Sequence, residues 1–344
     1  MQNQYTAIKE DLKDWKEWVK TYTTDTRRAY TQVINTFLPF LAIAVLMFFS
    51  YDYSWIFTLI FGIVNGLFLT RIFIIQHDCG HQSFTSSRKV NNTIGFICSL
   101  LTLIPFKYWA RSHNYHHAHN AQLDFRDIGD ITILTVREYD NLSFFEKIQY
   151  RVYRSFPIMF FLGPLYYIFI HSRLPLIRMK GWKKEKRALW WNNLALLSFY
   201  ILLEALIGYQ KLLFIQLPSI ITFAVVAIWV FYIQHQHDPN YKEWKSDWDF
   251  LIAAIKGSSY YKLSKLGHWF TGNIGYHHIH HLAPRIPFYY LAQCHRAHPI
   301  FEKYVTTLNF WSSFKCAFHK LWDEKNQKMI SFKTYHKMRR SFVV

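Results

Sequence analysis

Four long apolar segments constrain this chain more than any other feature of the sequence. They run over Phe37–Tyr51, Trp55–Ile75, Trp190–Tyr209 and Leu212–Ile233. A helix needs about 20 predominantly apolar residues to cross the ~30 Å of hydrocarbon in a membrane. The loop inside the first pair has no Lys or Arg, and the connection inside the second has only Lys211. We therefore predict an all-α integral membrane protein with four transmembrane helices arranged as two hairpins.

The rest of the chain is too polar to lie in the bilayer. Apolar residues make up 51% of the sequence, with 31 Phe, 23 Tyr and 13 Trp, yet the mean hydropathy is −0.03. The heavy aromatic content fits the aromatic belts of membrane proteins. A mean near zero requires large charged parts outside the membrane, so we expect a helical cytoplasmic cap beside the spans.

Charge predicts which parts face the cytoplasm. Lys and Arg outnumber Asp and Glu by 40 to 22, giving a formal charge of +18. Such an excess suits nucleic acid, anionic lipid or an acidic protein, and the spans favour the last two over nucleic acid. The basic residues gather in the N-terminal arm, in Ser86–Arg187 and after His237. By the positive-inside rule we expect a multi-pass protein of the cell inner (plasma) membrane with both termini cytoplasmic.

These features divide a single domain, residues 1–344, into five parts. They are an amphipathic arm (1–30), a first hairpin (37–75), a cytoplasmic region (76–188), a second hairpin (189–235) and a second cytoplasmic region (236–344). The arm carries Leu12, Trp15, Val19 and Tyr22 at helical spacing. Docking on the membrane surface and exposure to solvent are both open for it.

Two weaker apolar stretches, Ile94–Phe106 and Pro157–His171, are short for a membrane span. If the histidine-rich segments described next are to face one compartment, neither stretch can cross. We interpret both as interfacial or re-entrant helices, although a six-span arrangement stays open.

Histidines gather in three boxes. Box 1 is His77-Asp-Cys-Gly-His81, box 2 is His113-Asn-Tyr-His116-His117, and box 3 is His277-His278-Ile-His280-His281. On a helix, HxxxH puts two rings on one face, and HxxHH adds a ring on the neighbouring face. Box 1 follows the second span directly, and His235 follows the fourth. The spans would therefore deliver both to the same level.

The number of histidines points to two metal ions. Two ligands from box 1, three from each of the other boxes and His235 are too many for one ion. Imidazole suits Zn, Cu, Fe and Ni alike, but nine ligands with a position left open favour a dinuclear redox centre over a closed zinc site. We expect no catalytic residue beyond this centre. Two irons that activate O2 would supply the oxidant needed to remove hydrogen from a methylene group.

Other functions fit less well. A zinc protease needs HExxH, whereas Asp78 follows His77. A metal-binding or transport protein, the non-enzyme alternative, predicts ligands at the membrane midplane, where this sequence has almost none. Glu204 and Arg71 are the only ionisable residues well inside the spans, and Arg71 is near enough the end to snorkel. A hydroxylase with the same helices and the same dinuclear centre is the nearest enzymatic alternative to an enzyme that removes hydrogen.

With these boxes the chain resembles the membrane fatty-acid desaturases, and most closely the bacterial acyl-lipid desaturases of the Bacillus delta-5 type. The likeness also rests on six shorter motifs: Val33–Pro39, Arg71–His77, Gly129-Asp-Ile131, Gln234-His235, Gly272–His277 and His281-Leu-Ala-Pro284.

The resemblance implies a ligand set. His77, His81, His113, His117 and His280 would hold one iron, and His116, His235, His277 and His281 the other. Where animal relatives have an asparagine that holds a metal-bound water, this chain has Phe231. Asn273, one turn before His277, is the expected substitute. His237 and His268 rank second to His235, and His278 and His119 are expected to point away.

The resemblance also implies a reaction. A cis double bond would be inserted into the acyl chain of a membrane phospholipid or another acyl substrate, with O2 and two electrons consumed. We expect an external carrier, a ferredoxin or flavodoxin, to supply the electrons. The basic cytoplasmic face would suit such an acidic partner, although topology and lipid binding explain the same charges.

Overall fold

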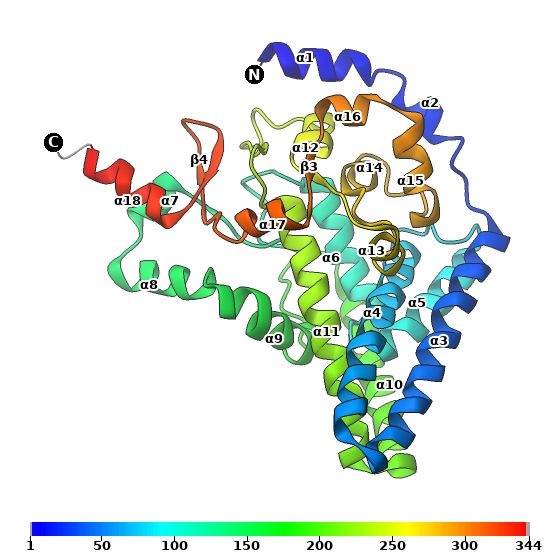
Figure 1. The fold of residues 1–344 in the computed structure, drawn as a ribbon. Coiled ribbons are helices and arrows are strands. Elements are labelled where there is room, and N and C mark those ends of the chain that lie inside the picture. The colour runs from blue at the N-terminus through cyan, green and yellow to red at the C-terminus, as the bar shows by residue number, and fades with distance from the viewer. Residues whose placement is uncertain (1, 342–344) are drawn as a thin grey trace.

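Four long helices form the membrane part of the computed structural model, which describes residues 2–341. They are α3 (Thr26–Tyr53), α4 (Trp55–Gly80), α10 (Lys183–Ile207) and α11 (Tyr209–His235), and each is long and apolar enough to cross a membrane. The prediction of four such helices in two hairpins is confirmed. Figure 1 shows the tight turns of the hairpins together at the narrow end of the molecule.

Single residues separate the helices of each hairpin. Ser54 lies between α3 and α4, and Gly208 between α10 and α11. Gly208 has φ +78°, a backbone conformation that favours glycine. The helices are longer than the apolar segments, because α3 starts at Thr26, where Asp25 accepts a hydrogen bond from the backbone of Arg28.

Close packing of α4 against α11 brings the ends of these two helices together. A Cβ added to Gly62 would lie 2.5 Å from Cβ of Pro218, and one added to Gly66 would lie 2.5 Å from Cβ of Thr222. Only glycine permits this approach, as at other membrane-helix interfaces with small residues. The ends of α4 and α11 carry His77 and His235, so this packing places box 1 and His235 at the same end of the bundle.

The two short apolar stretches belong to bent helix pairs. α5 (Arg88–Thr102) and α6 (Phe106–His119) meet at 100°, and α8 (Phe144–Tyr153) meets the segment Ile158–Arg173 at 57°. That segment contains a π-helical turn (Ile158–Leu162), α9 (Gly163–Phe169) and a 3₁₀ turn (His171–Arg173). Leu103, with φ +59°, ends α5, and Pro105 precedes α6. By length and composition each pair could also be one broken span, giving up to six.

The cap covers the wide end of the bundle and carries box 3. It consists of α12 (Phe250–Lys256), α13 (Lys265–Phe270), α14 (His277–Leu282), α15 (Phe288–Ala297) and α16 (Ile300–Tyr304). Strands β2 (Ser259–Tyr261) and β3 (Thr306–Leu308) pair in parallel, with Ser259 opposite Thr306. Figure 1 shows the cap directly above α4 and α6.

A side lobe projects beside the cap. It contains β1 (Leu134–Thr135), α7 (Val136–Asn141), α8, β4 (Leu321–Asp323), β5 (Lys328–Ile330) and α18 (Phe332–Ser341), and α17 (Phe310–Cys316) joins it to the cap. β1 pairs in parallel with β4, and β4 pairs antiparallel with β5. The prediction of an all-α protein did not include the five short strands, β1 to β5. Two or three residues are too few for the alternation that marks a strand.

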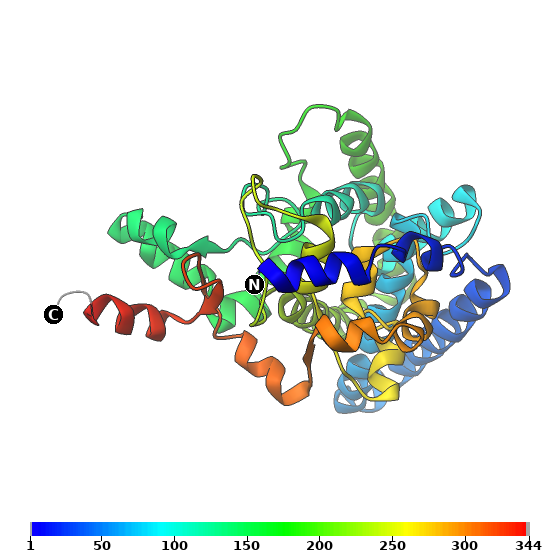
Figure 2. The ribbon, with the colours of Figure 1, turned by 90° about the horizontal axis from the view of Figure 1, so that it is seen from above.

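The N-terminal arm packs on the cap. It forms two short helices, α1 (Gln2–Asp11) and α2 (Trp15–Val19), and Leu12 is fully buried. Lys9 lies 2.7 Å from Asp249, and Asp11 lies 2.9 Å from Lys303. Figure 2 shows the arm crossing the top of the cap. Neither docking on the membrane nor exposure to solvent describes it, because its apolar stripe is covered by protein.

Two buried arginines join the layers. Arg71 of α4 is only 2% exposed and does not snorkel. It donates to Thr36 of α3 at 3.1 Å and to the carbonyl of Trp269 in the cap. Arg154, after α8, is fully buried and donates to the hydroxyl of Tyr232 at 2.9 Å. The bundle, the cap and the side lobe are thus linked by hydrogen bonds.

Candidate metal centre

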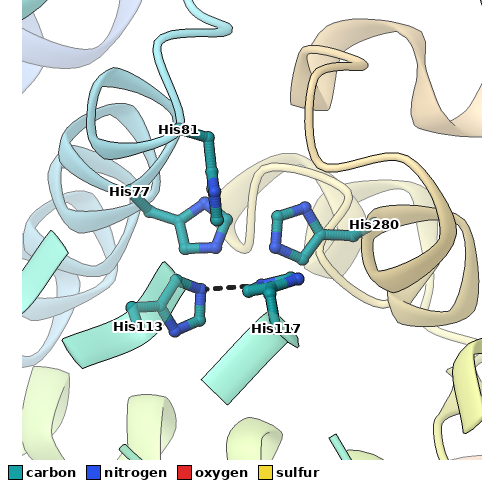
Figure 3. A group of neighbouring side chains, drawn as sticks. All are labelled: His77, His81, His113, His117 and His280. Carbon is teal, nitrogen blue, oxygen red and sulfur yellow. Dashed lines mark hydrogen bonds between the residues drawn. The ribbon is translucent and has the colours of Figure 1, made fainter. Parts of the chain in front are cut away.

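The first group of histidines forms where three helices meet. Box 1 lies at the end of α4, box 2 on α6 and box 3 on α14. The helical spacing puts His113 and His117 one turn apart, with their Nε2 atoms 3.1 Å from each other. One ring nitrogen from each of five buried histidines lies within 4.8 Å of all the others: His77, His81, His113, His117 and His280. Figure 3 shows the five rings turned toward a common centre.

The second group forms around His235. One ring nitrogen each of His116, His235 and His281 lies within 4.8 Å of the other two. His277 joins them, because its Nε2 lies 2.9 Å from Nε2 of His235 and 3.1 Å from Nε2 of His281. Nε2 of His116 lies 3.2 Å from Nε2 of His235. Thus the structure brings all nine predicted ligands into two groups.

The two groups share a boundary. The rings of His117 and His281 are stacked with their centroids 4.2 Å apart. His280 belongs to the first group, and its neighbour His281 belongs to the second. Because α6 and α14 each contribute to both groups, two ions held here would be close neighbours in one dinuclear centre.

The chemistry of these donors fits metal ions better than hydrogen bonds alone. Nε2 of His235 and of His277 each lies within about 3 Å of two other ring nitrogens. A neutral imidazole nitrogen has either one proton or one lone pair, so it can form only one good hydrogen bond. Each of these two nitrogens would have to share it between two partners. Nε2 of His81 and of His280 are buried without any hydrogen-bond partner. Ligand nitrogens at ~2.1 Å from an ion would lie at about these separations.

Burial also keeps the imidazoles in the form that binds metal. Removal from water holds the pKa of His277, His280 and His281 well below the ordinary value of histidine. A neutral ring offers a lone pair, whereas a protonated ring repels a cation. At neutral pH the third box is therefore ready for metal without losing protons.

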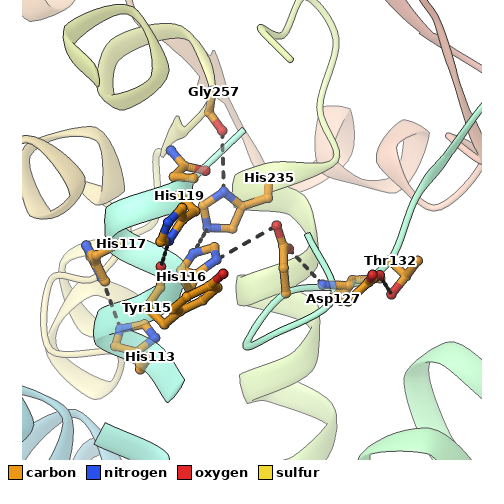
Figure 4. A network of polar contacts seen from close by, with 12 residues as sticks. His113, Tyr115, His116, His117, His119, Asp127, Thr132, His235 and Gly257 are labelled. Atoms are coloured by element: carbon orange, nitrogen blue, oxygen red, sulfur yellow. Dashed lines mark hydrogen bonds and ion pairs between the residues drawn. The ribbon is translucent and has the colours of Figure 1, made fainter. Parts of the chain in front are cut away.

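Two oxygen atoms orient ligand rings from behind, and a third lies near a ligand ring. Nδ1 of His77 lies 3.0 Å from Oδ1 of Asp78, and Nδ1 of His235 lies 3.3 Å from the carbonyl of Gly257. Nδ1 of His116 lies 3.8 Å from Oδ2 of Asp130. Figure 4 shows the contacts of His116 and His235. The hydrogen-bonded partners of His77 and His235 fix the tautomer, leaving Nε2 free for a metal.

No role was predicted for Asp78 or Asp130, although both lie in motifs that the sequence shares with the family. Asp78 is inside box 1, and Asp130 is inside the Gly129-Asp-Ile131 motif. Gly129 has φ +73°, and a Cβ there would lie 2.7 Å from the carbonyl of Ser112, so this loop lies tight against α6. For Asp78 the available signal was a carboxylate directly after a histidine of box 1.

The rival histidines lie outside the two groups. His237 donates from Nδ1 to the carbonyl of Pro239 at 2.8 Å, and His268 accepts from the backbone of Leu263 at 3.2 Å. His278 contacts His295 at 3.2 Å, and His119 donates to the carbonyl of Tyr115 at 2.8 Å. Each has a partner of its own away from the ligand rings, which agrees with their lower rank.

The predicted partner of a metal-bound water gains no support. The side-chain amide of Asn273 donates to the carbonyl of Phe288 at 3.2 Å, so it holds the chain that follows box 3. The ring of Phe231 lies 5.2 Å from that of His235 and 5.5 Å from that of His116. An apolar ring thus lines the second group where the animal relatives have an amide.

We expect Asp78→Asn to lower both metal affinity and turnover by about 10- to 100-fold, the usual effect of losing an orienting carboxylate. The two oxygens of Asp78 accept from His77 and, at 2.7 Å, from the backbone of Phe288. An amide of the same shape can fill only one of these roles as an acceptor. Metal analysis of the purified protein and a turnover assay measure the effect. Asp127→Asn, at an exposed position, is the control, and equal metal content and turnover in both variants would contradict the prediction.

Comparisons with known proteins agree with the geometry. The family model of fatty acid desaturases matches residues 53–312. A fatty acid desaturase of Bacillus subtilis (strain 168) is 40% identical over 311 residues, which cover 90% of this chain and 87% of the relative. An sn-1 acyl-lipid omega-3 desaturase (ferredoxin) of Synechocystis is 28% identical over 272 residues, 74% of this chain and 71% of the relative. An omega-3 fatty acid desaturase (endoplasmic reticulum) of Vigna radiata is 26% identical over 259 residues, 70% and 64%.

The predicted family is therefore confirmed, whereas the delta-5 position of the double bond stays a prediction. With three histidine boxes gathered in two adjoining groups at the ends of apolar helices, and with a relative that matches along nearly its whole length, this chain belongs to the fatty acid desaturase family.

Proposed function

We propose that the protein inserts a cis double bond into the acyl chain of a membrane lipid, using O2 and two electrons at a centre of two iron ions. The observation that carries the proposal is the pair of adjoining all-histidine groups. The five residues of the first group would hold one iron. His116, His235, His277 and His281 would hold the other. Bound there, the irons would supply the oxidant that removes two hydrogens from the acyl chain.

The protein itself supplies position and a dry environment. All nine ligand rings are at most 9% exposed, and Trp109 stacks on His113 with centroids 4.7 Å apart. Phe231 adds an apolar wall at the second group. Such surroundings exclude water from a strong oxidant and favour an apolar chain over a polar substrate. The nearby helices face the bilayer, from which a lipid substrate would enter.

We propose an external ferredoxin or flavodoxin as the electron donor. The Synechocystis relative is named as a ferredoxin-dependent enzyme, and the formal charge of +18 suits an acidic partner. The basic regions also suggest that the cap and both termini face the cytoplasm, with the protein in the inner membrane. Mapping the accessibility of single cysteines in the arm and near Gly208 tests this orientation.

The test of function is product analysis. The chain would be expressed in a host that lacks unsaturated lipids, and its fatty acids analysed by mass spectrometry. A desaturase yields acyl chains lighter by two hydrogens, and about two irons per purified chain should accompany them. Products heavier by one oxygen would identify a hydroxylase instead. The same host making a protein with alanine at all three histidines of box 2 is the control.

A further inference from the structure

A shallow, open basic hollow lies outside the centre described above. It is formed between the first half of α5 and the start of α6, with a volume of about 580 Å³. Its lining combines cationic, amide, hydroxyl and aromatic groups: Arg88, Lys89, Asn92, Thr93, Phe96 and Lys107.

The three cations of the hollow have no carboxylate to balance them. Within residues 2–341, Arg88, Lys89 and Lys107 form no ion pair with Asp or Glu, whereas Arg111 on α6 pairs with Glu185 at 2.8 Å. All three cationic side chains are exposed. Like charges around one hollow repel each other, and a bound anion would remove this repulsion. The hollow therefore suits an anionic group.

An apolar surface continues from the hollow along α5. Phe96 forms part of the lining, and its neighbour Ile97 is 46% exposed. α5 belongs to one of the bent apolar pairs at the wide end of the bundle, and the basic hollow is at its first turns. A ligand with an anionic head and a hydrocarbon tail would satisfy both surfaces. Basic side chains near a membrane surface attract the phosphates of anionic lipids.

We propose that the hollow binds the phosphate of a phospholipid headgroup, with the acyl chains of that lipid running along Phe96 and Ile97. The inference rests on the proposed function only for its link to the substrate. Lys107 is on the same helix as Trp109, which stacks on His113. A phosphate held at the start of α6 would thus fix one end of a lipid near the first histidine group, and the enzyme would favour phospholipids over lipids without phosphate.

The experiment measures lipid binding directly, without catalysis. Full-length protein in detergent is titrated with phosphatidylglycerol or with a glucosyl diacylglycerol that has the same acyl chains, and bound lipid is counted by native mass spectrometry. The variant carries Arg88→Gln, Lys89→Gln and Lys107→Gln. The control carries Arg178→Gln, Lys180→Gln and Lys184→Gln, which remove the same charge from exposed positions elsewhere.

We expect the variant to bind phosphatidylglycerol ~100-fold more weakly, and each single substitution to weaken it about fivefold. Binding of the glucolipid should not change, and the control should behave like the parent. In turnover assays the variant should raise KM for phosphatidylglycerol while kcat stays the same.

Three results would overturn the proposal. They are unchanged phosphatidylglycerol binding in the variant, an equal loss in the control, and displacement of the lipid by an equal concentration of inorganic phosphate, which would make this a site for a free anion. A parent protein that binds phosphatidylglycerol through these residues but desaturates no lipid would contradict the proposed function and leave the site in place.

Discussion

His280→Ala and His113→Ala should each abolish desaturation while the protein still inserts into the membrane. His280 is the sole residue of box 3 in the first group, and His113 faces it from α6. Losing an orienting partner of a ligand already costs about 10- to 100-fold, so losing the ligand should cost more than 100-fold. Bound iron should fall together with activity.

The measurement is iron content and turnover of each purified variant, with membrane insertion checked by fractionation. His119→Ala is the matched control for His113, because His119 is on the same helix and donates to its own backbone neighbour Tyr115. It should keep its iron and its activity. Full activity in purified His113→Ala protein would refute the ligand assignment.

Arg154→Leu should destabilise the folded protein by ~3 kcal/mol or more. The fully buried guanidinium donates to the carbonyl of Thr132 at 3.2 Å, to Gln236 at 3.0 Å and to the carbonyl of His319 at 2.9 Å. Leucine would leave Gln236 and the carbonyl of Thr132 without this donor, and each such loss costs about 1–3 kcal/mol. The carbonyl of His319 would keep the hydroxyl of Tyr232 as a donor, at 2.8 Å. Gln236 follows His235, so the loss should also disturb the second histidine group.

The thermal midpoint of unfolding in detergent, together with iron content, measures this effect. Arg137→Leu is the control, because the side chain of Arg137 is 69% exposed and its pair with Glu324 spans 3.3 Å. An exposed ion pair is worth at most about 1 kcal/mol. A midpoint for Arg154→Leu no lower than that of the control would show that the buried network contributes little.

The membrane helices could be predicted because a bilayer imposes a length on every span. The apolar segments identified α3, α4, α10 and α11. The helices themselves extend beyond the apolar residues into polar turns such as Thr26–Ala29. The histidine boxes could be predicted because helical spacing decides which rings share a face. His113 and His117 meet as that spacing requires.

Contacts between distant parts of the chain could not be predicted. The arm has an amphipathic pattern, but the pattern does not say whether lipid, water or the cap covers Leu12. Strands of two or three residues leave no pattern at all. Asn273 was predicted because it would lie one turn before His277 if both residues belonged to one helix. In the structure α14 begins only at His277, and Asn273 lies before it with φ +56°.

The histidine ligands come from four helices, α4, α6, α11 and α14, and this affects how much folded protein a cell can keep. Ions that bind only when all four helix ends are assembled stabilise the folded chain by mass action. Without them, many neutral imidazoles stay crowded in a buried space with unpaired nitrogens. The level of intact enzyme should therefore follow the iron supply, so that cells short of iron lose the protein as well as its activity.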